Sequence, residues 1–231
     1  NIDAKDAEKK IIKAFSSFKH GKAFDKNPIK EIQKTPGVHF MFKETDQTHL
    51  VLGFRGYDMF DDRRYALGLL GVILGGNMSS RFFMEIREKL GLAYYVRASA
   101  QHYTDSGYLA GSAGIPHEEL GRVVKLMIKI LKDVRTRGVS ESEIKFAKDY
   151  LRGSMALSFE SSDEIATFLG EQALFYEKIE TPKEVLRHIE KVRRGDIMKA
   201  AKELLRPEKI NLAVIGPHRQ PEKYAKILKE I

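Results

Sequence analysis

The seven histidines are the first residues to consider for metal chemistry, because imidazole is a common ligand of zinc and other transition metals. They are His20, His39, His49, His102, His117, His188 and His218. Zinc hydrolases often place two histidines within one helical turn, as in H-x-x-E-H, and no two histidines here lie that close together. The sequence HEE at 117–119 lacks the second histidine, and a helix start explains its acidic residues. We therefore expect no metal site in this chain.

Serine, cysteine and glycine motifs give no better candidate. The chain has no cysteine, and so no thiol nucleophile, thiolate metal site or disulfide. The sequence GSAG at 111–114 does not have the G-x-S-x-G spacing of a serine nucleophile elbow. The sequence GGNMSS at 75–80 has the spacing of neither a P-loop nor a dinucleotide fingerprint. We expect no bound nucleotide cofactor.

The remaining candidate is the segment 75–95, GGNMSSRFFMEIREKLGLAYY. Its middle part predicts a short helix with one apolar face, and Arg87 lies at the edge of that face. Gly91 allows the chain to leave this helix in a left-handed conformation and to enter a strand that carries Tyr94. The arginine and the tyrosine, seven residues apart, could converge on one spot.

A simpler interpretation of this segment is purely structural. GGNMSS can be a helix stop followed by a serine-capped helix start. Arg87 would then pair with Glu85, Glu88 or Glu143 at the surface, and Tyr94 would only pack against its neighbours.

The elements that must position these residues can be predicted from hydrophobic periodicity. Residues 38–44 and 49–56 predict an antiparallel hairpin, 93–103 and 108–115 predict a second strand pair, and 209–216 predict a last strand. Strands that arrive in pairs, followed by several helices, favour an α+β fold with an antiparallel or mixed sheet covered by helices.

Helices are expected before, between and after these strands. The predicted helices are 4–18, 65–74 after the capping residues Asp61 and Asp62, 79–89, and 221–231. Three more helix starts have capping-box spacing, with Pro182 at a first helical position: Ser140 with Glu143, Ser161 with Glu164, and Thr181 with Glu184. Residues 20–28, HGKAFDKNP, have no periodicity and predict a linker.

Composition places the chain among globular proteins, with 231 residues, 42% hydrophobic and 31% charged. The longest nearly apolar run, 65–76, is shorter than the ~20 residues of a membrane helix. The net charge of +8 makes a basic nucleic-acid or anion-binding module an alternative, but the basic residues alternate with acids along predicted helices, so we expect no nucleic acid partner. The lack of cysteine favours the cytoplasm over the periplasm or an organelle.

The sequence LGGNMSSRFFMEIREKLGLAYYV at 74–96 resembles the signature of the non-zinc half of the pitrilysin/insulinase family of metallopeptidases, which includes mitochondrial processing peptidase. Three other segments are similar to the same family: DQTHLVLGFRG at 46–56, the helical stretch at 131–161, and KINLAVIGP at 209–217. The resemblance covers about residues 30–217.

The resemblance implies two homologous α+β halves that face each other around a chamber. One half carries zinc, and the other carries an arginine and, seven residues later, a tyrosine, which correspond to Arg87 and Tyr94. These side chains can donate hydrogen bonds to a peptide carbonyl and to the oxyanion that develops when the peptide is attacked. The resemblance therefore implies a peptidase half that is inactive alone, with zinc in its partner and a peptide or unfolded polypeptide as substrate.

The resemblance also implies a domain organisation. Residues 1–30 are similar to the end of a preceding domain plus a linker, and 31–231 form the α+β domain. We expect Asn1 to be a cut point and the chain to be the C-terminal part of a single-chain peptidase, rather than a separately encoded partner subunit. A homo- or heterodimer remains open. A non-proteolytic subunit of a larger assembly remains the alternative.

Overall fold

The chain divides into two units between Lys30 and Glu31. The computed structural model describes residues 2–19, 21–22 and 26–231, so four positions of the predicted linker, 20 and 23–25, lie outside the described residues. The first unit contains helix α1 (Ala4–Phe15), which ends before the predicted residue 18. The carboxylate of Asp3 starts this helix by accepting the backbone N–H of Asp6 at 2.8 Å.

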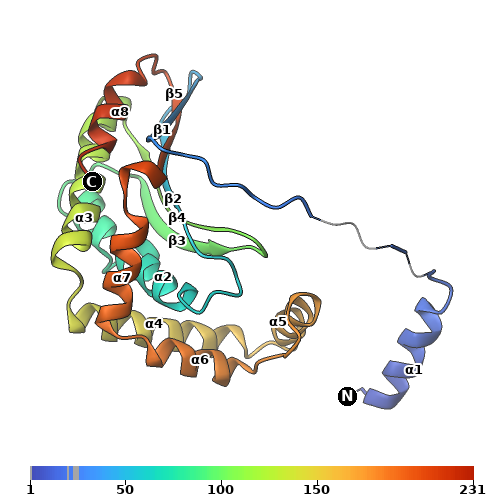
Figure 1. Ribbon diagram of the computed structural model, residues 1–231. Helices are drawn as coiled ribbons and strands as arrows, with labels where there is room; N and C mark the ends of the chain where they lie inside the picture. The colour runs from blue at the N-terminus through green and yellow to red at the C-terminus, as the bar shows by residue number, and fades with distance from the viewer. Residues whose placement is uncertain (1, 20, 23–25) are drawn as a thin grey trace. The chain divides into compact units, whose positions relative to one another are not determined.

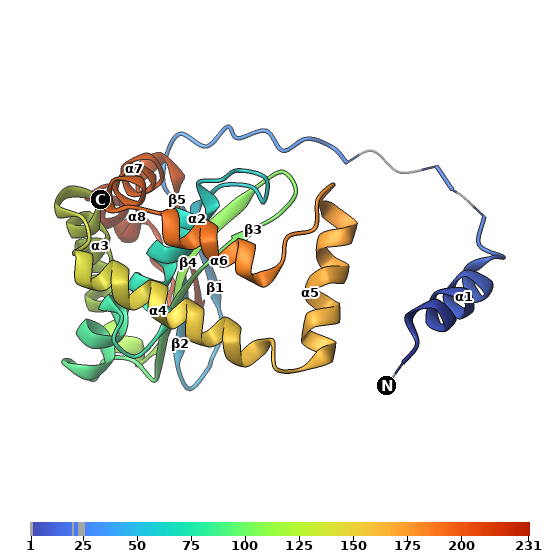
Figure 2. The same cartoon turned by 90° about the horizontal axis from the view of Figure 1, so that it is seen from below.

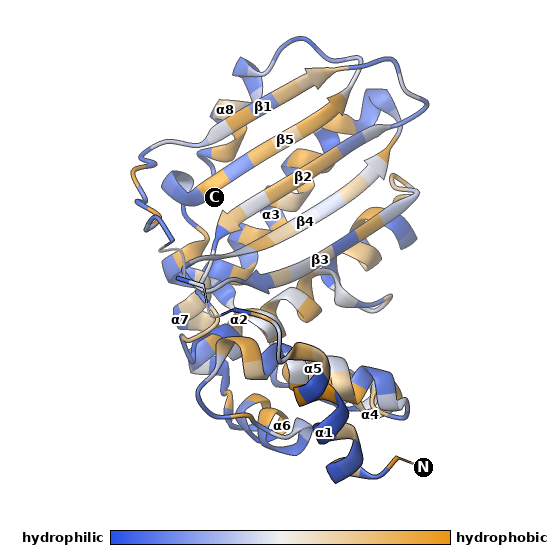
Figure 3. Ribbon diagram, turned by 90° about the vertical axis from the view of Figure 1, so that its right-hand side faces the viewer, coloured by the Kyte–Doolittle hydropathy of each residue, from blue (hydrophilic) through white to orange (hydrophobic). Residues whose placement is uncertain are grey.

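A five-stranded mixed sheet forms the centre of the second unit, and Figure 3 shows its strands in the order β1-β5-β2-β4-β3. Its strands are β1 (Gly37–Phe42), β2 (Thr48–Arg55), β3 (Tyr95–His102), β4 (Gly107–Ile115) and β5 (Ile210–Gly216). Only β1 and β5 are parallel, whereas β2, β3 and β4 pair antiparallel with their neighbours. The predicted α+β class and the predicted pairing of β3 with β4 are confirmed.

The predicted hairpin of the first two strands is wrong, because β5 lies between them. β5 pairs parallel with β1 and antiparallel with β2, which makes it an inner strand. Its alternate residues Ile210, Leu212 and Val214 are buried, so the last strand of the chain fills the middle of the core. Burial of this apolar strand favours the inner position over an edge.

Helices cover one face of the sheet and extend beyond its end. They are α2 (Arg64–Gly71), the π-helical η1 (Val72–Gly76) and η2 (Phe83–Glu88), the 3₁₀ turns η3 (His117–Glu119) and η4 (Pro207–Lys209), α3 (Leu120–Arg137), α4 (Glu141–Ser158), α5 (Ser162–Phe175), α6 (Pro182–Lys191), α7 (Arg194–Leu204) and α8 (Glu222–Leu228). Figures 1 and 2 show α2, α3, α7 and α8 along the sheet and α4 to α6 beyond one end of it. Across the described residues, no helix combines the length and the apolar character that a membrane span requires.

Alternation along the strands separates a core face from an open face. In β2, Leu50, Leu52 and Phe54 are at most 2% exposed, whereas Val51, between two of them, is 43% exposed. The core side chains pack against apolar residues of α2 and α3, including Leu67, Leu70, Val123, Val124 and Met127. The helices therefore bury one face of the sheet, and the other face remains open.

Two of the three predicted capping boxes are present. Ser140 with Glu143 starts α4, and Thr181 with Glu184 starts α6, with Pro182 at the first helical position. Helix α5 begins after Ser161 as expected, but the serine side chain makes no capping hydrogen bond. The capping-box spacing thus predicts all three helix starts correctly, but the predicted side-chain cap at Ser161 is absent.

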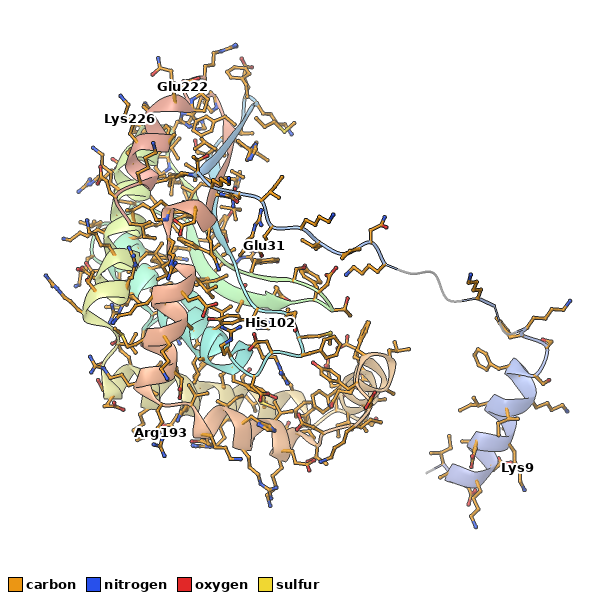
Figure 4. All side chains as sticks on the ribbon, viewed as in Figure 1. Lys9, Glu31, His102, Arg193, Glu222 and Lys226 are labelled. Carbon is orange, nitrogen blue, oxygen red and sulfur yellow. The ribbon has the colours of Figure 1, made fainter. Side chains whose placement is uncertain are left out.

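The far end of the β3–β4 pair is held by a half-buried histidine. His102, labelled in Figure 4, places its Nδ1 2.8 Å from the carbonyl oxygen of Tyr57. Burial lowers the pKa of His102 below its ordinary value, although this carbonyl acts in the opposite sense. The neutral ring donates its Nδ1 proton to the carbonyl, which fixes the β3–β4 turn to the connection after β2.

Candidate functional site

Glycine lets the end of the α2–η1 helix lie directly against strand β3. A Cβ atom on Gly75 would lie 2.2 Å from the backbone nitrogen of Ala98, and one on Gly71 would lie 3.1 Å from that of Ala100. Gly75 also has non-helical backbone angles, with φ of −164° and ψ of 18°, so the predicted helix stop is confirmed. The absence of a side chain at Gly75 therefore determines how closely the next segment approaches the sheet.

The turn after these glycines is capped by an asparagine and not by the predicted serine. Asn77 accepts the backbone N–H of Ser79 through its side-chain oxygen at 2.9 Å. Ser80 is 3% exposed, and its hydroxyl donates to the carbonyl oxygen of Asn77. The amide of Asn77 is well suited to this local turn.

An arginine–carboxylate pair anchors the start of the following helix to α4. Arg81 donates from Nε and Nη2 to the two carboxylate oxygens of Glu143, at 2.6 and 2.9 Å, and from Nη2 to the carbonyl oxygen of Gly138 at 3.0 Å. Burial favours the neutral form of Glu143, but hydrogen bonds from Arg81 and Ser140 outweigh it and lower the pKa to about 2. The pair thus ties the Arg87 segment to the capping box of α4.

Arg87 lies on the exposed side of η2, as the apolar periodicity predicts. Phe82, just before this helix, and Ile86 within it are buried, at 1% and 0% exposure, and hold the helix against the core. Gly91 adopts a φ of +61°, and its N–H donates to the carbonyl oxygen of Arg87 at 3.0 Å. The predicted left-handed exit from the helix is confirmed.

Tyr94 is fixed through its backbone and exposed at its side chain. Its N–H donates to the carbonyl oxygen of Gly114 at 2.8 Å, and its side chain is 59% exposed. The next residue, Tyr95, stacks on His49, with its hydroxyl 3.1 Å from the His49 Nδ1. Tyr94 therefore extends into solvent from a backbone that is already part of the sheet.

The surface ion pair that would have explained Arg87 structurally is absent from the described part of the chain. Glu85 pairs with Lys89, and Glu143 pairs with Arg81. The described contact of the Arg87 guanidinium is with the ring of Phe83, whose centroid lies 5.3 Å from the guanidinium carbon. Arg87 thus retains its hydrogen-bond donors for a partner outside these residues.

Two histidines that the sequence offers as isolated residues come together around a buried threonine. Thr48, 0% exposed, has its hydroxyl oxygen 2.8 Å from the Nδ1 of His117 and 2.7 Å from the Nε2 of His218. The Nε2 of His117 lies 2.8 Å from the carbonyl oxygen of Thr45 and so carries the proton. Thr48 therefore donates to His117 and accepts from His218, an arrangement that links the start of β2 to η3 and to the connection after β5.

These histidines do not form a metal centre. In the described ranges of the chain, no group of three or more histidine, aspartate or glutamate side chains is placed to hold a metal ion. The HEE sequence at 117–119 forms the 3₁₀ turn η3 before α3, where its histidine has the structural contacts described above. Among the described residues, the side chains around His117 and His218 therefore do not fit a zinc ion.

The open face of the sheet contains a hollow of about 760 Å³ that the sequence analysis did not identify. Its polar lining comes from four strands: Arg55, Arg97, Ser99, Gln101, Tyr108, Ser112 and Asn211. The signal was available in the alternation of YVRASAQH, where arginine, serine and glutamine recur at every second residue. The open-face hollow is thus a second candidate feature of the domain, and neither Arg87 nor Tyr94 lines it.

A match to a family model shows which protein family this chain belongs to. The family model described as "Peptidase M16 inactive domain" matches residues 1–151, which is more than half of the chain. The chain belongs to the M16 peptidase family. The matched residues include the segment with Arg87 and Tyr94, and the resemblance seen in the sequence is confirmed.

Curated relatives of this M16 domain are named as zinc proteases. An uncharacterized zinc protease of Mycobacterium bovis is 34% identical over 187 residues, which cover 81% of this chain and 42% of that protein. One from Rickettsia bellii is 32% identical over 219 residues, covering 94% of this chain and 52% of that protein. The M16 domain spans about half the length of the curated relatives it matches.

Solved structures share the fold of this M16 domain. A protease from Helicobacter pylori has a TM-score of 0.84 at 18% identity, covering 94% of this chain and 53% of its own. An M16 inactive domain from Pseudomonas fluorescens has a TM-score of 0.83 at 22% identity, with coverage of 96% and 52%. Complex III2 from Candida albicans has a TM-score of 0.80 at 13% identity, with coverage of 99% and 57%. At these identities the likeness concerns the fold alone.

Proposed function

We propose that this chain is the non-zinc half of a zinc endopeptidase, which closes the catalytic chamber and contributes Arg87 and Tyr94 to substrate binding and transition-state stabilisation. The observation that carries the proposal is that both side chains are exposed on a rigidly held connection, and that Arg87 has no ion-pair partner in the described residues. Buried neighbours, a glycine turn and a sheet hydrogen bond fix their backbones, so the donors are positioned before a substrate arrives.

The two side chains have different tasks in this proposal. The Arg87 guanidinium donates to the carbonyl oxygen of the bound peptide and holds the chain in place. The Tyr94 hydroxyl donates to the oxygen that gains negative charge as the carbonyl carbon is attacked, so its hydrogen bond strengthens as the reaction proceeds. In this proposal zinc is held by the other half, and the curated relatives named as zinc proteases extend beyond the part that this chain covers.

A non-proteolytic role in a larger assembly is the second candidate. The likeness to a chain of complex III2, with a TM-score of 0.80, is the observation that favours it. In such a role the domain would contribute contact surface, and the donors of Arg87 and Tyr94 would not be needed for activity.

A complementation assay separates the two candidates. The zinc-bearing half, the present chain and the two together would be incubated with an internally quenched peptide, and the zinc content of each preparation would be measured. We expect cleavage only when both halves are present, with zinc retained by the other half. Equal cleavage by the zinc-bearing half alone would contradict the proposal and leave the assembly role.

A further inference from the structure

The open face of the sheet is electrostatically one-sided. None of the strands β1 to β5 contains an aspartate or a glutamate. Two arginines face the open side, Arg55 on β2 and Arg97 on β3, and both line the open-face hollow. Figure 3 looks onto this face, with β3 and β4 coloured mostly pale to blue. The surface therefore favours a ligand that carries negative charge.

The two arginines differ in how much of their charge is already compensated. A nitrogen of Arg55 lies 3.6 Å from a carboxylate oxygen of Glu31, which is labelled in Figure 4. Arg97 is exposed, and no acidic side chain in the described ranges pairs with it. The unpaired positive charge of the open-face hollow thus resides on Arg97.

Arg97 is held in an orientation that suits a carboxylate. Its Nε donates to the hydroxyl of Ser112, directly opposite on β4, at 3.2 Å. The guanidinium carbon lies 6.0 Å from the ring centroid of Tyr95, at the limit of a cation–π contact. With Nε engaged, the two terminal nitrogens remain as a parallel pair of donors, the geometry that binds both oxygens of one carboxylate.

The surroundings of Arg97 suit a peptide rather than a small ion. Ser99, Gln101, Tyr108 and Asn211 add neutral hydrogen-bonding groups to a hollow of about 760 Å³. Ligand hollows typically have about 300–1,000 Å³. Backbone amides and a neighbouring side chain of an extended peptide could occupy this space and be hydrogen-bonded together.

We propose that the open-face hollow binds an acidic side chain of the peptide substrate, and that Arg97 is the residue that selects it. This inference rests on the proposed function, because it assigns a substrate preference to the same peptidase. A nucleic acid phosphate is the rival occupant, but a phosphate track needs several unpaired basic residues, and strands β1 to β5, all within the described residues, offer Arg97 alone.

Peptide selectivity of the complete protein tests the inference. Two quenched peptides of the same length would be compared, one with glutamates flanking the scissile bond and one with glutamines at the same positions. We expect kcat/KM to be about tenfold higher for the glutamate peptide, as for one partly exposed charge-assisted pair. Added salt should reduce the ratio, because exposed charges are screened.

Arg97→Gln should bring this ratio close to one by lowering kcat/KM for the glutamate peptide. Lys125→Gln is the matched control, since it removes one exposed positive charge from α3, on the covered side of the sheet, and should leave the ratio unchanged. A ratio that survives Arg97→Gln would overturn the inference, as would equal cleavage of the two peptides by the wild type.

Binding separates failure of this inference from failure of the proposed function. If the complete protein cleaves neither peptide, the proposed function is wrong, and fluorescence anisotropy of the same peptides still tests Arg97. The inference then requires the glutamate peptide to bind about tenfold more tightly than the glutamine peptide, and Arg97→Gln to abolish the difference. Tighter binding of a single-stranded oligonucleotide than of the glutamate peptide would overturn it in favour of phosphate.

Discussion

Glu143 should stabilise this domain by an amount that depends on pH. Arg81 and Ser140 hold its pKa at about 2, against an ordinary value of 4.5. A difference of this size between the folded and unfolded chain corresponds to about 3 kcal/mol. Because the side chain is 30% exposed, screening by water reduces the expected contribution to about 2 kcal/mol. We expect Glu143→Gln to lower the free energy of unfolding by that amount at pH 7.

The pH dependence follows from the sign of this shift. The folded-state pKa of Glu143 is depressed, so the stabilisation is fully present above pH 4.5 and is lost as the pH falls towards 2. Urea unfolding of the wild type and of Glu143→Gln at pH 7, 5, 4 and 3 measures the difference. It should be largest at pH 7 and shrink below pH 4.5.

Glu141→Gln provides the control for this experiment. Glu141 lies in the same first turn of α4 but is exposed, so it shares the helix-end position without the Arg81 contact. Its replacement should cost less than about 0.5 kcal/mol. An equal effect of the two substitutions, or a difference that does not change with pH, would refute the reasoning and remove the Arg81 pair as an anchor of the candidate site.

Three further predictions concern buried contacts of the domain. Gly75→Ala should lower the free energy of unfolding by about 1–3 kcal/mol, because the added Cβ would lie 2.2 Å from the backbone nitrogen of Ala98. Gly68→Ala is the control: its Cβ would lie in open space on α2, so the free energy of unfolding should stay unchanged or rise by up to about 1 kcal/mol. Thermal melts of the two variants measure the difference. Thr48→Val should cost about 1–3 kcal/mol in urea unfolding by leaving two histidines without their partner, and a cost near zero would contradict that network. Burial, His117 and a nearby lysine lower the pKa of His218, so stability should fall as the pH drops below 6.5, and His218→Gln should flatten that fall.

Local signals in the sequence predicted the local structure around the site well. The apolar stripe placed Arg87 on the exposed side of η2, and Gly91 marked the left-handed exit, because both features depend on neighbouring residues only. The capping boxes at Ser140 and Thr181 formed for the same reason. At Ser161 the spacing was present without the hydrogen bond, so spacing alone does not secure a cap.

Contacts between distant segments could not be predicted in the same way. Strand β5 pairs with β1 and β2 across most of the chain, and nothing in the local pattern of the first two strands excludes a hairpin. The partner of Glu143 was also missed, since Arg81, just before η2, and Glu143, in the first turn of α4, are 62 residues apart and meet only through tertiary structure. Arg97 became a candidate once the structure showed which face of β3 is open.

The most direct test of the central claim is steady-state cleavage of one quenched peptide by the complete protein, with Arg87→Ala and Tyr94→Phe compared with the wild type. We expect each substitution to lower kcat/KM about 100-fold, the cost typical of losing one oxyanion donor, and Tyr94→Phe to act mainly on kcat. Both side chains are exposed, so thermal melts should show unchanged folding. Wild-type turnover in both variants would contradict the assignment of these residues to the reaction.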